Sequence, residues 1–190
     1  MSLTEVDWSL IPAPVDDGKA DHLKGMSLPQ VRLQATDGAA VMLADLCGLA
    51  VIYVYPMTGR PDRDLPDGWN DIPGARGCTP QSCAFRDHFA ELREWGVKHL
   101  FGISTQTSED QMDAAKRLHL PFPLLSDADR ALGQTLDLPG FVIDGRHLHR
   151  RLTMIAEEGI IKEVFYPVFP PDQDAENVID WLRRHAEERP

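Results

Sequence analysis

Apolar runs and amphipathic segments alternate along this chain, and they predict a series of strands and helices. Residues 50–56 (AVIYVYP) form a continuous apolar, β-branched and aromatic run, which is typical of a strand buried on both faces. Two further apolar runs predict strands at 97–104 and, more briefly, at 122–127. Apolar residues at helical spacing predict helices over 79–96, about 108–118, 128–138 and 173–187.

Two β-hairpins stand on either side of this series. Residues 28–46 predict two short strands joined by an Asp-Gly turn, and residues 149–168 predict a second pair joined by a Glu-Gly turn. Alternating strands and helices that end in an antiparallel hairpin indicate an α/β fold, with a mixed central sheet flanked by helices. In open sheets of this kind, ligands bind at the loops that follow the carboxyl ends of the strands.

Two segments lack any apolar periodicity. Residues 1–25 are polar and proline-rich, and we expect them to form an arm on the surface of a single domain made by residues 26–190. Residues 57–77 are rich in proline and glycine and predict a loop that directly follows the buried strand. A loop of this length in a compact domain is more often functional than not.

Composition and charge argue against several classes of partner. The formal net charge of −11 argues against a nucleic-acid partner, because nucleic-acid binders concentrate basic charge. No stretch approaches the roughly 20 apolar residues that a membrane helix needs, and the first 25 residues lack the pattern of a secretory signal. We therefore expect a cytoplasmic protein. In that compartment structural disulfides are rare, and cysteines that matter tend to be catalytic or metal-binding.

Cys78 and Cys83 lie five positions apart in GCTPQSC, in a chain with three cysteines. If both lie in the helix, five residues rise about 7.5 Å and turn about 140°, which separates the Cα atoms by roughly 8–9 Å. A disulfide needs Cα atoms closer than about 7 Å. The two thiols can therefore bridge only if the start of the helix unwinds, so we expect oxidation to be coupled to local unfolding.

Cys78 is the better candidate nucleophile, because the positive end of a helix dipole and its free N–H groups favour the thiolate. Arg76 could add positive charge, although an exposed arginine that serves only solubility is equally expected. Cys83 should be less exposed and less acidic, since it lies one turn deeper. Cys47, at the turn before the buried strand, is expected to be structural, with a role as an alternative disulfide partner left open.

Metal chemistry has little support in the sequence. A zinc site needs about four ligands at spacings such as CxxC or HxxxH, and none is present. His147 and His149 flank Leu148 and can share one face of a strand, but such a pair is more often the polar edge of a hairpin. The sequence predicts no metal and no cofactor.

The run GCTPQSCAFRD, from Gly77 to Asp87, resembles the active-site helix of the peroxiredoxin Q (bacterioferritin comigratory protein) branch of the peroxiredoxins. That branch carries a peroxidatic cysteine, a resolving cysteine five residues later, and Phe-Arg-Asp after it. The resemblance extends from about Leu28 to the C-terminal helix and includes VIYVYP, LFGIS, PFPLLSDAD and RLTMI. It implies a thioredoxin-like fold and a thiol peroxidase.

The resemblance also implies roles for the two thiols. The Cys78 thiolate would attack a hydroperoxide, release water or an alcohol, and become a sulfenic acid, with which Cys83 would condense to a disulfide. Thioredoxin or a similar dithiol would then reduce that disulfide. The reaction needs no metal, haem or flavin in the protein. Members of this branch are often monomers or weak dimers.

The family also uses an arginine close to the peroxidatic cysteine, to hold the thiolate charged and to stabilise negative charge as the O–O bond breaks. The family's Arg-x-Thr pattern fits Arg151 best. Arg150 is the alternative if the strand register slips by one residue, which would place it on the other face.

One departure from the family pattern concerns the hydroxyl that orients the peroxide. The usual Thr or Ser three residues before the cysteine is replaced by Ala75, and the insertion at about 57–77 separates Pro56 from Cys78. Thr58 can fold back to supply the hydroxyl, Thr79 can supply it, or the role is lost; we favour Thr58. Within the insertion, the Pro73-Gly74 pair can shield the thiolate as the family's proline does.

Two other functions are possible on the same fold. A thiol–disulfide oxidoreductase acting on protein disulfides would favour CxxC, because a two-residue gap lets both sulfurs meet without unwinding the helix. A peroxide-sensing redox switch would use Cys78 and Cys83 without catalytic turnover. Peroxide consumption with thioredoxin, its reductase and NADPH separates these functions from a peroxidase.

Overall fold

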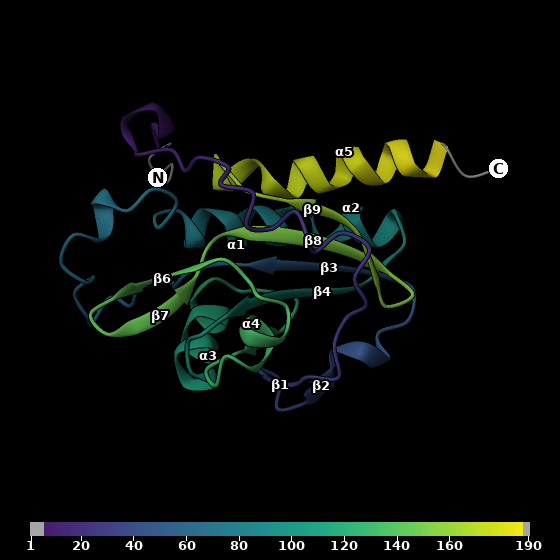
Figure 1. Ribbon diagram of the computed structural model, residues 1–190, viewed down its shortest axis with the longest axis horizontal. Helices are drawn as coiled ribbons and strands as arrows, with labels where there is room; N and C mark the ends of the chain where they lie inside the picture. Colours follow the sequence, from purple (N-terminus) through teal and green to yellow (C-terminus); the bar gives the residue numbers. More distant parts are fainter. Residues whose placement is uncertain (1–5, 188–190) are drawn as a thin grey trace.

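A seven-stranded mixed sheet lies at the centre of the computed structural model, which describes residues 6–187 of the chain (Figure 1). The strand order is β2-β1-β5-β4-β3-β8-β9. Its strands are β1 Arg32–Ala35, β2 Ala40–Met42, β3 Leu49–Val54, β4 Val97–Ser104, β5 Leu124–Ser126, β8 Leu152–Glu157 and β9 Ile160–Phe165. β3 pairs in parallel with β4 and antiparallel with β8. The α/β fold with a mixed sheet is therefore confirmed, as are the two predicted hairpins β1–β2 and β8–β9.

β3 occupies the middle of the sheet because its apolar run can be buried on both faces. Its residues from Ala50 to Val54 are at most 1% exposed, and the Tyr53 ring stacks on Phe85 with centroids 4.6 Å apart. Leu152, the first residue of β8, pairs with Val54 at the end of β3. The residues just before β8 therefore lie beside the carboxyl end of β3, where the insertion begins.

Helices cover both faces of this sheet. α1 (Cys78–Asp87), α2 (Phe89–Glu94) and α5 (Asp174–Glu187) bury apolar side chains on one face, where Figure 1 shows α5 above α1 and α2. The short helix α4 (Ala131–Thr135) and the residue after it contribute Leu132 and Leu136 to the core on the other face. α3 (Ser108–Arg117) packs beside β5.

The helix predicted over residues 79–96 is two helices. α1 begins one residue earlier, at Cys78, and ends at Asp87, while His88 adopts a non-helical φ of −96° and ψ of 7° before α2 begins. The His88 ring bonds the carbonyl of Ala84 through Nδ1 at 2.9 Å, so the side chain competes for a backbone acceptor at the break. Gly96 ends the second helix with a φ of 90°, as predicted.

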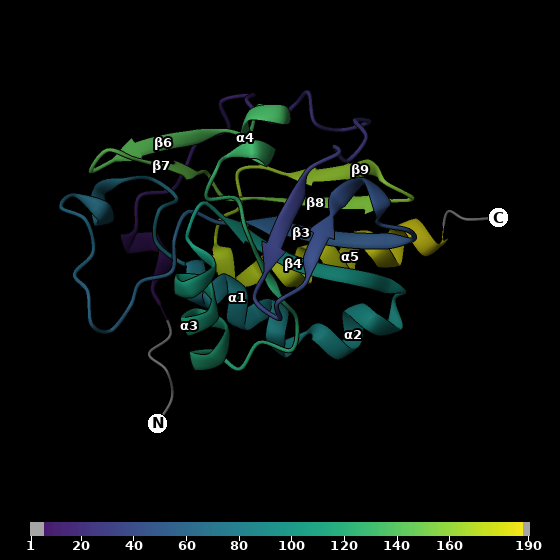
Figure 2. The same cartoon turned by 90° about the horizontal axis from the view of Figure 1, so that it is seen from below.

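A third hairpin, β6 (Gly140–Ile143) and β7 (Arg146–His149), was not predicted. It forms a separate two-stranded sheet that lies next to the insertion in both ribbon views (Figure 2). Trp69 and Ala75 of the insertion pack with Ile143 and Leu148 of this hairpin. Each segment therefore covers the apolar side chains of the other.

The predicted arm at residues 1–25 is described only from residue 6, and residues 1–5 and 188–190 lie outside the described part of the chain. Trp8 packs edge-on against Phe169 and donates a hydrogen bond from its indole to Asp172, near the start of α5. Ala20 and Leu23 are buried in the same core cluster as Ile161 of β9 and Leu132 of α4. The division at residue 25 stays a prediction. Within residues 6–187, no helix has the length and apolar content to cross a bilayer.

Candidate active site

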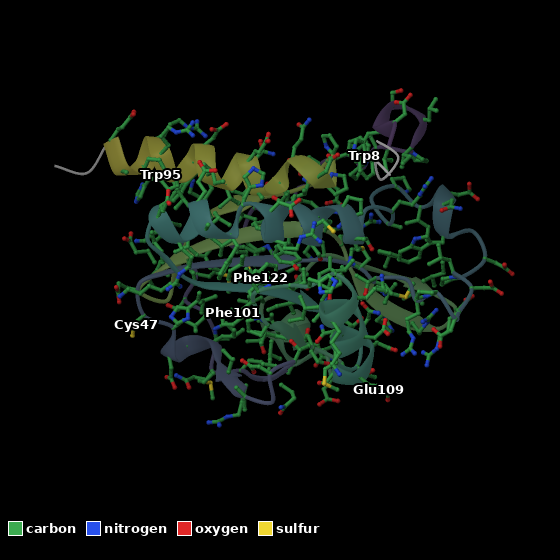
Figure 3. All side chains as sticks on the ribbon, turned by 180° about the vertical axis from the view of Figure 1, so that it is seen from behind. Trp8, Cys47, Trp95, Phe101, Glu109 and Phe122 are labelled. Carbon is green, nitrogen blue, oxygen red and sulfur yellow. The ribbon has the colours of Figure 1, made fainter. Side chains whose placement is uncertain are left out.

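Cys78 is the first residue of α1 and is only 2% exposed. The preceding residue, Gly77, has a φ of 106°, a left-handed conformation that favours glycine. A Cβ at Gly77 would collide with the Pro171 ring and press on the Trp8 indole. The turn that presents Cys78 is therefore closed over by the N-terminal arm and by the segment before α5. Figure 3 labels Trp8 beside the first turn of α5.

Arg151 lies directly before β8, is 3% exposed, and donates from Nη2 to Cys78 Sγ at 3.4 Å. The same nitrogen donates to the carbonyls of Gly74, Ala75 and Arg76 at 3.2, 3.3 and 2.9 Å. One guanidinium thus holds the end of the insertion and faces the thiol at the helix start. The side chain of Arg76 is exposed.

The neighbouring Arg150 points elsewhere. Its guanidinium carbon lies 5.6 Å from the centroid of the Phe141 ring on β6. The structure therefore brings Arg151, rather than Arg150, to Cys78, in the register that the Arg-x-Thr pattern predicts.

A chain of buried polar groups continues from Arg151 into the protein. Arg151 Nη1 donates to Gln81 Oε1, and Gln81 Nε2 donates to Asp174 Oδ2 at 2.7 Å. The Thr153 hydroxyl donates to the same carboxylate oxygen at 2.7 Å. Burial raises the pKa of Asp174 to about 6, although the two hydrogen bonds and the Arg151 charge act in the opposite direction.

Cys83 is half-buried and therefore more exposed than Cys78, so the expectation that it is the less exposed thiol is wrong. The reason is tertiary: Pro171, Trp8 and the end of the insertion close over the helix start, whereas Cys83 lies five residues along, on another side of α1. Burial raises the pKa of the Cys83 thiol, and the adjacent Arg86 opposes this shift. Both thiols are free, and α1 is continuous between them.

Thr58, the favoured source of the peroxide-orienting hydroxyl, lies in a different cavity. Its backbone N–H and its hydroxyl donate to Gln106 Oε1 at 2.9 and 3.2 Å. It lines a cavity of about 380 Å³ together with Arg60 and Arg146, and Cys78 does not line that cavity. The structure therefore does not bring Thr58 to the thiol. Thr79, the second residue of α1, directly follows Cys78 and is partly buried.

At Ala75, three residues before Cys78, the backbone carbonyl lies near the thiol. The Cys78 thiol donates weakly to the carbonyl of Ala75, with Sγ 3.7 Å from the oxygen. Pro73 is exposed, and it lines a small pocket with Gly74 and Arg151. Arg151 donates to the Gly74 carbonyl, and the shielding of the thiolate by Pro73 and Gly74 stays a prediction.

The third thiol is remote from this site. Cys47 is exposed and donates weakly to the carbonyl of Asp45 at 3.6 Å. Figure 3 labels it at the opposite end of the molecule from Trp8, whose indole packs beside the turn before Cys78.

The two histidines of β7 differ from one another. His147 is exposed, as the reading of a polar hairpin edge predicts. His149 is buried, and its Nε2 lies 2.8 Å from Asp127 Oδ2, so that reading is wrong for His149. Within residues 6–187, no three or more His, Cys, Asp or Glu side chains form a group that could hold a metal.

Sequence reasoning missed Gln81 and Asp174. The spacing in the sequence could have identified Gln81, because it lies three residues after Cys78 and therefore shares its helix face. Asp174 had none, since an aspartate at the start of a helix is commonly placed there by the helix dipole alone.

The Redoxin family matches residues 23–179 of this chain. The chain is 33% identical to peroxiredoxin Bcp of Escherichia coli K12 over 165 residues, which cover 83% of this chain and 94% of that protein. This chain belongs to the peroxiredoxins, in the Q/Bcp branch. It is also 28% identical over 161 residues to the chloroplastic peroxiredoxin Q of Sedum lineare, covering 84% of this chain and 77% of that protein.

The fold of this peroxiredoxin is the thioredoxin-like one of its family. A mutant of PrxQ from Xylella fastidiosa superposes with a TM-score of 0.69 at 20% identity, covering 86% of this chain and 96% of that one. Membership in the Q/Bcp branch makes the protein a thiol-dependent peroxidase rather than a disulfide oxidoreductase or a switch without turnover.

Proposed function

We propose that Cys78 is the peroxidatic cysteine of this peroxiredoxin. The observation that carries the proposal is the position of the buried Cys78 sulfur, at the start of α1 and 3.4 Å from Nη2 of Arg151. Both the helix terminus and the guanidinium favour the thiolate over the thiol. They also place positive charge where negative charge develops on the leaving oxygen.

The first step is transfer of one oxygen from a hydroperoxide to the sulfur. The Cys78 thiolate attacks one peroxide oxygen and the O–O bond breaks. The leaving alkoxide or hydroxide takes a proton and departs as an alcohol or water. Sulfur is oxidised to sulfenic acid and the peroxide is reduced. We expect hydrogen peroxide and organic hydroperoxides as substrates.

The second step joins Cys83 to Cys78. The Cys83 thiol condenses with the sulfenic acid, a disulfide forms and one water is released. Because both residues lie in the intact α1, the first turn must unwind before the sulfurs meet. Thioredoxin or a similar dithiol then reduces the disulfide by thiol exchange and becomes oxidised itself. A cytoplasmic location, where such dithiols are kept reduced, and a monomeric or weakly dimeric state stay predictions.

The three cysteines provide a test with an internal control. In a coupled assay with thioredoxin, its reductase and NADPH, Cys78→Ser should abolish peroxide-dependent NADPH oxidation, and Cys47→Ser should leave it unchanged. Mass spectrometry after one equivalent of peroxide should show Cys78 joined to Cys83. A Cys78→Ser variant that turns over at the wild-type rate, or a disulfide that contains Cys47, would contradict the proposal.

A further inference from the structure

Asp174 is a fully buried carboxyl group in a region where burying a charge is costly. Its Oδ2 accepts hydrogen bonds from Gln81 and Thr153, and its Oδ1 has no partner among the described residues. It lies on the first turn of α5, far from Cys78 in sequence. No step of the peroxide chemistry uses it directly.

The partners of Gln81 fix the orientation of its amide. Gln81 is also fully buried, between the Asp174 carboxyl and the Arg151 guanidinium. A guanidinium can only donate hydrogen bonds, and an ionised carboxylate can only accept them. The amide nitrogen must therefore face Asp174, and the amide oxygen must face Arg151.

The Arg151 guanidinium, which donates to the Gln81 oxygen, also donates to the Cys78 sulfur. Arg151 uses Nη1 for Gln81 and Nη2 for Cys78 and three carbonyls, while its Nε has no partner among the described residues. Among the described residues, Gln81 is thus the only side chain besides Cys78 to which Arg151 donates a hydrogen bond. A rotated Gln81 amide would present N–H groups to a donor and push the guanidinium out of place.

We propose that Asp174 is a positioning residue: it orients the Gln81 amide, and through Gln81 it holds the Arg151 guanidinium against Cys78. This inference rests on the proposed role of Cys78. Loss of Asp174 should lower the reactivity of Cys78 although the two residues are not in contact.

The charge of Asp174 affects the hydrogen bonds that join it to Gln81 and Arg151. Its pKa is raised to about 6 by burial, so the carboxyl changes charge within the working range of most proteins. A protonated carboxyl can donate as well as accept, and it no longer dictates the direction of the Gln81 amide. The polar and ionisable groups on the elements packed around Asp174 come from four places. They are Gln81 and Cys78 on α1, Arg151 just before β8 and Thr153 on it, Tyr53 on β3, and the exposed Asp172 and Glu176 two residues before and after Asp174.

A double-mutant cycle separates positioning from simple structural support. We expect Asp174→Ala to lower the second-order rate constant of the reduced protein with hydrogen peroxide about tenfold. Gln81→Ala should cause a similar loss, and the double variant should be no slower than Gln81→Ala, because Asp174 acts through Gln81. Glu176→Ala, which removes a charge from the same turn of α5, is the control and should leave the rate unchanged.

A second measurement does not depend on peroxide turnover or on a cavity-forming variant. Alkylation of Cys78 by iodoacetamide, followed by mass spectrometry between pH 5 and 8, should show an inflection near pH 6 that is absent in Asp174→Asn. This substitution keeps the shape and an acceptor oxygen but cannot ionise.

Two results would overturn the inference: losses in Asp174→Ala and Gln81→Ala that multiply in the double variant, or an inflection that persists in Asp174→Asn. Failure of the proposed function is distinguishable from both, since it would show as peroxide turnover that survives Cys78→Ser.

Discussion

Removal of the Arg151 guanidinium tests the electrostatic basis of this site. Arg151 Nη2 lies 3.4 Å from Cys78 Sγ, and both side chains are almost fully buried. Two unit charges at that distance attract by about 5 kcal/mol at an effective dielectric constant of about 20. Three backbone carbonyls share the same nitrogen, so the effect on reactivity should be smaller.

We therefore expect Arg151→Ala to slow the first oxidation of Cys78 by about 10²- to 10³-fold, the range found when one oxyanion donor is removed. Arg151→Lys should fall between this variant and the wild type, because a lysine keeps the charge but cannot donate in several directions from one planar group. The measurement is the second-order rate constant of the fully reduced protein with hydrogen peroxide, by stopped flow.

Arg150→Ala is the matched control, since it removes the same side chain one residue away, from a position over the Phe141 ring. Its rate should stay close to that of the wild type. An Arg151→Ala rate within about threefold of the wild type, or an equal loss in Arg150→Ala, would refute the electrostatic reasoning.

Three further predictions concern other parts of the site. Cys83→Ser should react once with peroxide and then stall as a sulfenic acid or become over-oxidised, which intact-mass spectrometry detects; an equal loss of the first step in Cys83→Ser and Cys78→Ser would contradict the assigned roles. The pKa of Asp174 is raised from 3.8 to about 6 in the folded state, so the free energy of unfolding should fall by about 3 kcal/mol as pH rises through that interval. Between pH 4 and pH 7, urea unfolding should show a change in stability that differs between the wild type and Asp174→Asn by about this amount, with the wild type losing more. Thr58→Val should leave the peroxide rate unchanged, because the Thr58 hydroxyl is bonded to Gln106; a tenfold loss would restore Thr58 as the peroxide-orienting group.

The strands of the central sheet could be read from the sequence because local pattern determines them, and Arg151 could be chosen because the resemblance supplies the family's Arg-x-Thr pattern. A long apolar run has to be buried on both faces, and this placed β3 in the centre of the sheet. The structure turns Arg151 toward Cys78 and Arg150 toward the Phe141 ring, and the family's Arg-x-Thr pattern selected the residue that faces Cys78.

The rest depends on contacts between segments that are distant in sequence. The β6–β7 hairpin has two weakly apolar strands around Asp144-Gly145, and its Ile143 and Leu148 are buried against Trp69 and Ala75 of the insertion. The exposure of Cys83 relative to Cys78 could not be predicted either, because the helix start is covered by residues from both ends of the chain. Asp174 likewise became part of the site through tertiary packing alone.

The N-terminal arm and the segment before α5 meet at the turn before Cys78. Trp8 and Pro171 leave no room for a side chain at Gly77, and the helix that follows Pro171 contributes the carboxyl that Gln81 contacts. Removing the arm that carries Trp8, or Pro171 together with α5, would therefore change the surroundings of Cys78. Kinetic constants measured after either segment is removed would describe an altered active site.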